Sequence, residues 1–202
     1  MTHSVSSPLG ALDETRLPAY VSNGVIGLRV REMPLRAGLT LVSGYAGEHP
    51  IRRIEAAATA PYPVAGDVQV AGVWMSDALQ QAIAVDQSYD FACGELTSRF
   101  EFAAGGVKAR VQVITFCSRD MPCLVCQDIV VDVDGTGPLA LKSIVDARHV
   151  DGRALRHFRD TPGETDPACD GAALWESAGG LSTCCLQTGL NGPIYGEAGS
   201  AW

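Results

Sequence analysis

The sequence has few basic residues and no long apolar run, and each absence excludes a class of protein. Its 202 residues carry 15 Lys and Arg against 23 Asp and Glu, which gives a formal net charge of −8. Without clustered Lys and Arg, a surface for nucleic acid or anionic membrane is not expected. No stretch reaches about 18 apolar residues, so no transmembrane helix is expected. Residues 1–16 also lack the basic segment and apolar run of a secretory signal.

Seven cysteines are an odd number for a disulfide framework, and no export signal precedes them. Thiols stay reduced in the cytoplasm, so the sequence predicts a cytoplasmic protein with free cysteines. With 47% hydrophobic and 19% charged residues, the chain can bury a core of its own, which excludes a disordered or collagen-like protein.

Polar and apolar residues alternate with a period of two, which is typical of half-buried β-strands. The clearest case is residues 95–103 followed by residues 107–113. Between them, A-A-G-G at 103–106 supplies glycines that can adopt the positive φ of a tight turn. These two runs are predicted to form a hairpin.

Further strand-like runs are short and separated by turn residues. They span residues 25–31, 39–43, 67–75, 124–133, 139–145, 171–176 and 181–188. Such a series predicts an all-β, mainly antiparallel sandwich. Residues 135–137 are interpreted as a hairpin turn. Residues 76–85 fit either a short helix capped by Ser76 or a strand, and the pattern does not decide between them.

The two ends of the chain and one internal segment lack this alternation. Residues 1–16 are expected to be flexible, residues 17–190 to form the sandwich domain, and residues 191–202 to be a disordered tail. Residues 146–170 are polar and long for a connection, which predicts a functional or a poorly ordered loop. In this loop His149, Asp151 and His157 could supply a base or a metal ligand, but a solvated loop explains the same residues.

The pair C-L-V-C at 123–126 has the spacing of half a zinc site or of a redox dithiol. No second pair of ligands follows, and on a strand residues three apart point to opposite faces. Cys123 and Cys126 are therefore interpreted as buried structural cysteines, and the adjacent Cys184 and Cys185 should diverge as well. No metal site is expected.

Other chemistry-bearing motifs are lacking: the sequence has no G-x-S-x-G elbow, H-E-x-x-H helix or Walker loop. Aromatic residues make up only 6% of the chain. Trp74 and Trp175 could present a flat face to a saccharide, but both lie inside strand-like runs, where core packing is the favoured interpretation.

One ordered set of motifs resembles a known family. It comprises N-G-V-I-G-L-R at 23–29, L-V-S-G-Y at 41–45, the segment 54–70, Y-D-F-A-C-G-E-L-T-S-R at 89–99 and F-C-S-R-D-M-P at 116–122. In order and spacing these resemble the N-terminal β-sandwich of glycoside hydrolase family 65, which includes maltose, trehalose and kojibiose phosphorylases and the glucosidase of glucosyl-galactosyl-hydroxylysine. The resemblance implies a supersandwich of the galactose-mutarotase type. Its final strands are expected to be missing, because the family's domain is longer.

The residues that match the family's motifs are expected to have structural roles. They are Asn23, Gly24, Gly27, Arg29, Asp90, Gly94 and Arg99. Gly24 and Gly27 allow a positive φ or a close backbone approach beside a strand. An ion pair between Asp90 and Arg99 would fix a turn.

In the family, as the resemblance implies, the catalytic groups lie in an (α/α)6 barrel that follows the sandwich. This sequence has no run of amphipathic helices for such a barrel, so no catalytic residue is assigned and the chain alone is expected to be inactive. The resemblance implies that the parent enzyme hydrolyses or phosphorolyses an α-glucosidic bond without an organic cofactor. Its implied partners are the saccharide, a barrel in cis or in trans, and a second copy of the chain in a homodimer.

Two further hypotheses remain open. The chain could be a stand-alone carbohydrate-binding sandwich that uses Trp74, Trp175, His149 or Asp151. It could instead be an interaction domain that joins a separately encoded barrel. A sandwich without its barrel should expose an apolar patch on the order of several hundred Å².

Overall fold

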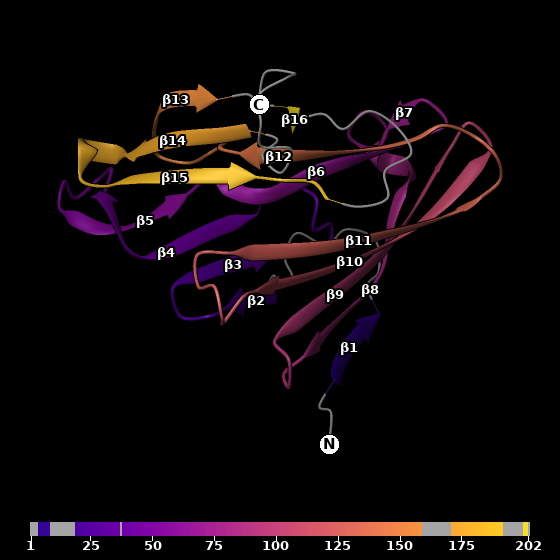
Figure 1. Ribbon diagram of the computed structural model, residues 1–202, viewed down its shortest axis with the longest axis horizontal. Helices are drawn as coiled ribbons and strands as arrows, with labels where there is room; N and C mark the ends of the chain where they lie inside the picture. The colour runs from indigo at the N-terminus through magenta and orange to yellow at the C-terminus, as the bar shows by residue number, and fades with distance from the viewer. Residues whose placement is uncertain (1–3, 9–18, 37, 159–170, 192–199, 202) are drawn as a thin grey trace.

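The chain folds almost entirely into β-strands, and nearly all neighbouring strands are antiparallel (Figure 1). The computed structural model describes residues 4–8, 19–36, 38–158, 171–191 and 200–201. Within these ranges the only helices are three 3-10 turns, and none has the length or hydrophobicity to cross a membrane: η1 (Met75–Asp77), η2 (Leu79–Gln81) and η3 (Ala178–Gly180). The prediction of an all-β, mainly antiparallel, sandwich-like fold is confirmed.

The strands of the described residues form four sheets. The five-stranded sheet has the order β1 (Ser4–Pro8), β8 (Ala82–Asp90), β9 (Glu95–Ala104), β10 (Val107–Cys117) and β11 (Val125–Asp134). The N-terminal sheet has the order β2 (Ala19–Ser22), β3 (Ile26–Val30), β4 (Leu39–Glu48) and β5 (Glu55–Ala60). The β6–β12 sheet has the order β16 (Ser200–Ala201), β12 (Leu139–Asp146), β6 (Tyr62–Val70) and β7 (Val73–Trp74). The three-stranded sheet has the order β13 (Gly152–Phe158), β14 (Gly171–Ser177) and β15 (Thr183–Thr188).

Alternation of polar and apolar residues builds the five-stranded sheet. In β9 and β10 one face is buried, including Phe100, Phe102 and Val111, while the other face is polar. The turn between the two strands has Gly105 at φ +58° and Gly106 at φ +77°, which the predicted hairpin requires. Burial of each Phe contributes about 1.5–3 kcal/mol. The hairpin predicted from the sequence is thus also the centre of the core.

The buried face of this sheet packs on a second layer, formed by the N-terminal sheet and the β6–β12 sheet (Figure 1). One core cluster joins Phe102 of β9 to Val68 of β6 and to Met33. A second cluster joins Leu28 of β3 to Leu96, near the start of β9, and also contains Val21 of β2. This second cluster holds the N-terminal sheet against the end of the β9–β10 hairpin that is opposite its turn.

Two short strands lie in segments that were predicted to be unstructured. β1, within the end 1–16 that is predicted to be flexible, pairs with β8 and has Ser4 opposite Asp90. β16, within the tail 191–202 that is predicted to be disordered, pairs in parallel with β12. Both pairings use the backbone of an edge strand, which requires no apolar alternation. The rest of the N-terminal segment, and 192–199 and 202 of the tail, lie outside the described residues.

The loop predicted at residues 146–170 is wrong for its middle part, because β13 pairs with β14 there. A register shift between Ala154 and Arg156 interrupts the alternation, which hides this strand in the sequence. Residues 159–170 of the segment lie outside the described part of the chain.

The structure corrects or decides three other local predictions. Residues 76–85 form no α-helix: η1 and η2 lead into β8, which begins at Ala82, and Trp74 rather than Ser76 occupies the first cap, without a side-chain hydrogen bond. Residues 135–137 are not a hairpin turn, because they connect β11 in one layer to β12 in the other. The predicted strand at 67–75 is divided by a turn in which Ala71 has φ +49° and Gly72 has φ +82°.

Candidate functional site

Asn23 ties two turns together that are distant in the sequence. Its Nδ2 donates hydrogen bonds to the carbonyl oxygens of Ser118 (2.5 Å) and Pro122 (2.9 Å). Its Oδ1 accepts hydrogen bonds from the backbone N–H groups of Val25 (3.0 Å) and Ile26 (2.9 Å). An amide side chain has two donors and an acceptor with two lone pairs, so all of its capacity is used. The asparagine of the N-G motif therefore closes the β2–β3 turn and fastens it to the β10–β11 connection.

A third turn lies against these two. Gly94, between β8 and β9, has φ +75°, and the guanidinium of Arg119 lies 3.7 Å from the position that a Cβ on Gly94 would take. Asp90 caps the same turn, because its Oδ1 accepts a hydrogen bond from the N–H of Ala92 (2.8 Å) and its carbonyl oxygen accepts one from Gly94 (2.8 Å). The β8–β9 turn therefore adjoins the β10–β11 connection through Arg119.

We refer to residues 22–26, 90–94 and 118–124 together as the turn cluster. Four of the seven motif-matching residues lie in it: Asn23, Gly24, Asp90 and Gly94. Gly24 has φ +92°, as the structural interpretation of the motif expects. The motif residues in the turn cluster thus form and cap turns.

The predicted ion pair between Asp90 and Arg99 is wrong. In the β8–β9 register Asp90 lies opposite Glu95, whereas Arg99 lies opposite Asp86. Arg99 accordingly binds Asp86 (Nη1 to Oδ2, 2.8 Å), and its Nε donates a hydrogen bond to Gln112 (2.9 Å). This pair lies on an exposed face, where an ion pair stabilises by about 0–1 kcal/mol.

Cys93 belongs to the turn cluster and is exposed, but it is not an activated thiol. Desolvation raises the pKa of Cys93, and so do the carboxylates of Asp90 and Glu95. Conversely, the hydrogen bonds from the N–H of Ala92 and from the Cys93 thiol lower the pKa of Asp90. Because the thiolate is the nucleophilic form, a raised pKa argues against covalent catalysis by Cys93.

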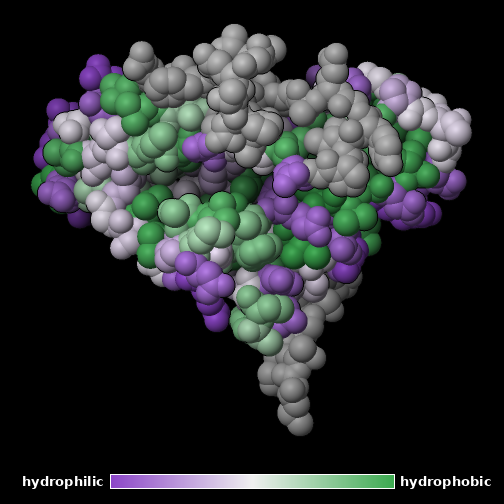
Figure 2. All heavy atoms as spheres, in the orientation of Figure 1, coloured by the Kyte–Doolittle hydropathy of each residue, from purple (hydrophilic) through white to green (hydrophobic). Residues whose placement is uncertain are grey.

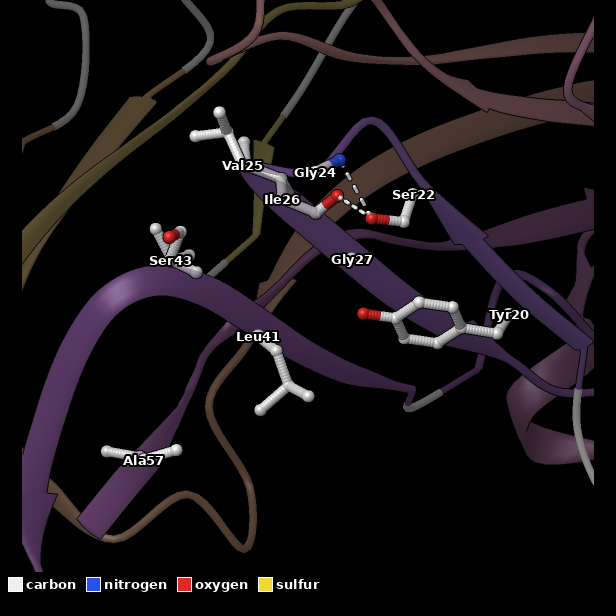
Figure 3. A pocket seen from close by; sticks show the side chains of 11 residues that line it. Tyr20, Ser22, Gly24, Val25, Ile26, Gly27, Leu41, Ser43 and Ala57 are labelled. Carbon is white, nitrogen blue, oxygen red and sulfur yellow. Dashed lines mark hydrogen bonds between the residues drawn. The ribbon is translucent and has the colours of Figure 1, made fainter.

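Beside the turn cluster, the outer face of the N-terminal sheet carries a shallow pocket of about 190 Å³ (Figure 3). The ring of Tyr20 lies across Gly27, and its Oη and Cζ occupy the place where a Cβ on Gly27 would be. In the β2–β3 register Ser22 is opposite Gly27 and Tyr20 is opposite the exposed Arg29, so Tyr20 is a diagonal neighbour of Gly27. Because Gly27 has no side chain, it leaves room for the ring of Tyr20.

The two tryptophans suggested by the sequence do not form a saccharide platform. Trp175 is only 9% exposed, and its Nε1 lies 2.8 Å from the position that a Cβ on Gly152 would take. Trp74 is half-buried, and the Nζ of Lys142 lies 4.2 Å from its ring centroid. Lys142 also pairs with the buried carboxylate of Asp67 (3.4 Å). These contacts agree with the interpretation that both tryptophans pack within the protein.

His149 and Asp151 lie near each other in the sequence but have different surroundings. His149 is exposed at φ +63° in the turn after β12. In this turn burial raises the pKa of Asp146, but the hydrogen bonds and charge of Arg148 outweigh it and hold that pKa below its usual value.

Asp151 lines a second, more polar pocket of about 270 Å³. There Glu48 forms an ion pair with Arg53 (2.5 Å), a residue with φ +55°. Two acids and one base line this pocket, but within the described residues no three His, Cys, Asp or Glu side chains gather as metal ligands.

The cysteine predictions are only partly correct. Cys123 is exposed, ahead of β11, so its interpretation as a buried cysteine is wrong, whereas Cys126 is half-buried in β11. Cys184 is half-buried and Cys185 exposed, as expected for adjacent strand residues. All six cysteines in the described ranges are free thiols.

No protein-family model matches the chain, and no curated protein matches its sequence. The neutral pocket beside the turn cluster can bind a ligand or a partner.

Tyr20 is the residue of this site that the sequence reasoning missed. β2 has only four residues, and its alternation is too short to stand out. A glycine inside a strand signals a close approach of another group. The sequence signal at Gly27 was therefore present, but only the strand register identifies Tyr20 as the group that approaches.

Proposed function

We propose that this chain is the N-terminal, non-catalytic β-sandwich domain of a glycoside hydrolase family 65-like enzyme. The parent enzyme hydrolyses or phosphorolyses an α-glucosidic bond in an (α/α)6 barrel. The sandwich packs on that barrel, present in cis or in trans, and shapes one side of its cleft. Because the described cysteines are free thiols, we also propose a cytoplasmic location.

Exposed apolar side chains on the turn cluster carry the proposal. Val25 (42% exposed), Phe91 (61%), Met121 (57%) and Leu124 (39%) all lie on its three turns. The contacts of Asn23 described above hold two of these turns rigidly in place. In Figure 2 hydrophobic residues form several groups on the face in view, with hydrophilic residues between and around them. Apolar residues grouped on rigid turns are typical of a surface that contacts another protein.

The outer face of the five-stranded sheet is richer in charge, although the exposed Ile83 (59%) and Val130 (51%) also lie on it. There Lys108 binds Glu101 (2.7 Å), and Arg110 binds Asp132 (3.2 Å), in addition to the pair that Arg99 makes. These side chains are partly exposed and satisfy one another. A face covered by mutual ion pairs is well suited to water, so the turn cluster is the better candidate for docking.

The first experiment reads the coding sequence downstream of residue 202 and co-produces any helical polypeptide encoded there with the 202-residue chain. We expect a stable complex on size-exclusion chromatography. We also expect turnover of α-glucosyl disaccharides, with or without phosphate, only in the complex. Leu124→Lys should weaken the complex at least tenfold, because it places a charge in a contact that excludes water.

Val130→Lys is the matched control. Val130 is 51% exposed, but it lies on β11, on the polar side of the five-stranded sheet, so its substitution should leave assembly unchanged. Turnover by the isolated chain, or assembly that is equally sensitive to both substitutions, would contradict the proposal.

A further inference from the structure

The pocket on the N-terminal sheet is built around a flat aromatic ring. Because Gly27 has no side chain, the ring of Tyr20 can lie down on the sheet, and yet Tyr20 remains 49% exposed (Figure 3). A tyrosine held in this way presents an apolar ring surface together with a polar hydroxyl. Leu41 and Ala57 also line the pocket.

The rest of the pocket is neutral and carries hydroxyl groups. Within the described residues no charged side chain lines it, which disfavours an ionic ligand. Ser43 contributes an exposed hydroxyl, which can both donate and accept a hydrogen bond. The hydroxyl of Ser22 is already engaged, since it donates to Ile26 (3.0 Å) and accepts from Gly24 (3.1 Å). Ser22 therefore stabilises the backbone at the edge of the pocket, whereas Tyr20 and Ser43 are the polar side chains that could bind a ligand.

We infer that the Tyr20–Gly27 pocket binds one ring of a neutral saccharide, with the apolar face of the sugar stacked on Tyr20 and its hydroxyls near Ser43. A pyranose combines an apolar C–H face with a hydroxyl-bearing edge, which matches a ring flanked by a hydroxyl. At about 190 Å³ the pocket is smaller than the roughly 300–1,000 Å³ of sites for drug-sized ligands, which suits a single sugar ring.

The position of the pocket links it to the turn cluster. Gly24 and Val25 belong to the turn cluster and also line the pocket, so a saccharide bound here would lie at the border of the docking surface. That the sugar is an α-glucosyl unit rests on the proposed function, whereas the stacking site itself does not.

The test uses the 202-residue chain with methyl α-glucoside, maltose and maltotriose as probes. Saturation-transfer NMR and calorimetry measure the affinity for each sugar. We expect saturable binding in the wild type. Tyr20→Leu, which keeps apolar bulk but removes the aromatic ring, should weaken binding at least tenfold. Tyr20→Phe, which keeps the aromatic ring and removes only the hydroxyl, should retain binding within about threefold. Gly27→Ala should weaken binding because its methyl group displaces the ring.

Ile83→Ala is the control, because Ile83 is 59% exposed on β8 and belongs neither to the pocket nor to the turn cluster. Circular dichroism checks that each variant remains folded. Absence of binding in the wild type, full binding by Tyr20→Leu, or tighter binding of adenosine than of any sugar would overturn the inference. None of these results would change the assembly measured with Leu124→Lys, so failure here is distinguishable from failure of the proposed function.

Discussion

The side chain of Asn23 is expected to contribute more to stability than its half-buried position suggests. Replacement by Ala removes the two bonds that it donates to Ser118 and Pro122 and the two that it accepts from Val25 and Ile26. Replacement by Asp keeps the two accepted bonds but removes both donors. It also places a carboxylate against the two carbonyl oxygens, which repel it.

The size of the effect follows from these bonds. An intramolecular hydrogen bond contributes about 1 kcal/mol net, but water can replace the two bonds that are exposed. Asn23→Ala should therefore lower the free energy of unfolding by about 2 kcal/mol. For a domain of this size that corresponds to roughly 4–8 °C in Tm. Asn23→Asp should lower the free energy of unfolding by at least as much at neutral pH. Its difference in stability from the wild type should become smaller near pH 4, where the introduced carboxylate takes up a proton.

Urea unfolding followed by circular dichroism, at pH 7 and at pH 4, measures both effects. Asn191 is an exposed asparagine after β15, so Asn191→Ala and Asn191→Asp are matched controls that should change little. If Asn23→Asp were as stable as wild type at pH 7, the donated bonds would not matter. The conclusion that Asn23 stabilises the contact between the β2–β3 turn and the β10–β11 connection would then be refuted.

Two further changes test the hairpin and the Asp146 turn. Gly105→Ala should destabilise more than Gly106→Ala, because both have positive φ but only the methyl at Gly105 would lie 2.8 Å from the Cβ of Ala71; equal losses in urea unfolding would contradict this. Although burial raises the pKa of Asp146, the bonds from Arg148 lower it overall, so its contribution to stability is present above about pH 4 and lost as the pH falls through the lowered value. Asp146→Asn should therefore make Tm change less between neutral and acid pH. If the change of Tm with pH were the same as in the wild type, the role of the Asp146–Arg148 pair would be contradicted.

Much of the fold could be predicted because its central strands show a regular alternation. The β9–β10 hairpin combines an alternating pattern with two glycines in the turn, and both features depend only on nearby residues. Where an irregularity interrupts the alternation, as in β13, the sequence pattern disappears although the strand remains.

Side-chain partners were harder to predict than strands, because they depend on register. Asp90 and Arg99 are both in the motif and close in sequence, but the β8–β9 register places Asp86 opposite Arg99 instead. The same limit applies to Tyr20 and Gly27, which are diagonal neighbours only because Ser22 pairs with Gly27.

The seven motif residues include none of the four side chains proposed to dock, although Gly24 and Gly27 line the Tyr20 pocket, and the structure gives a physical reason for this separation. Asn23, Gly24 and Gly94 occupy backbone conformations or hydrogen-bond positions that few other residues could take. Exposed positions such as Val25 and Leu124 have no such constraint, so their side chains can be chosen for a partner. The motif residues Asn23, Gly24, Asp90 and Gly94 therefore fix the turns that carry the side chains proposed to dock, and substitutions at the exposed positions are the ones that should separate binding from folding.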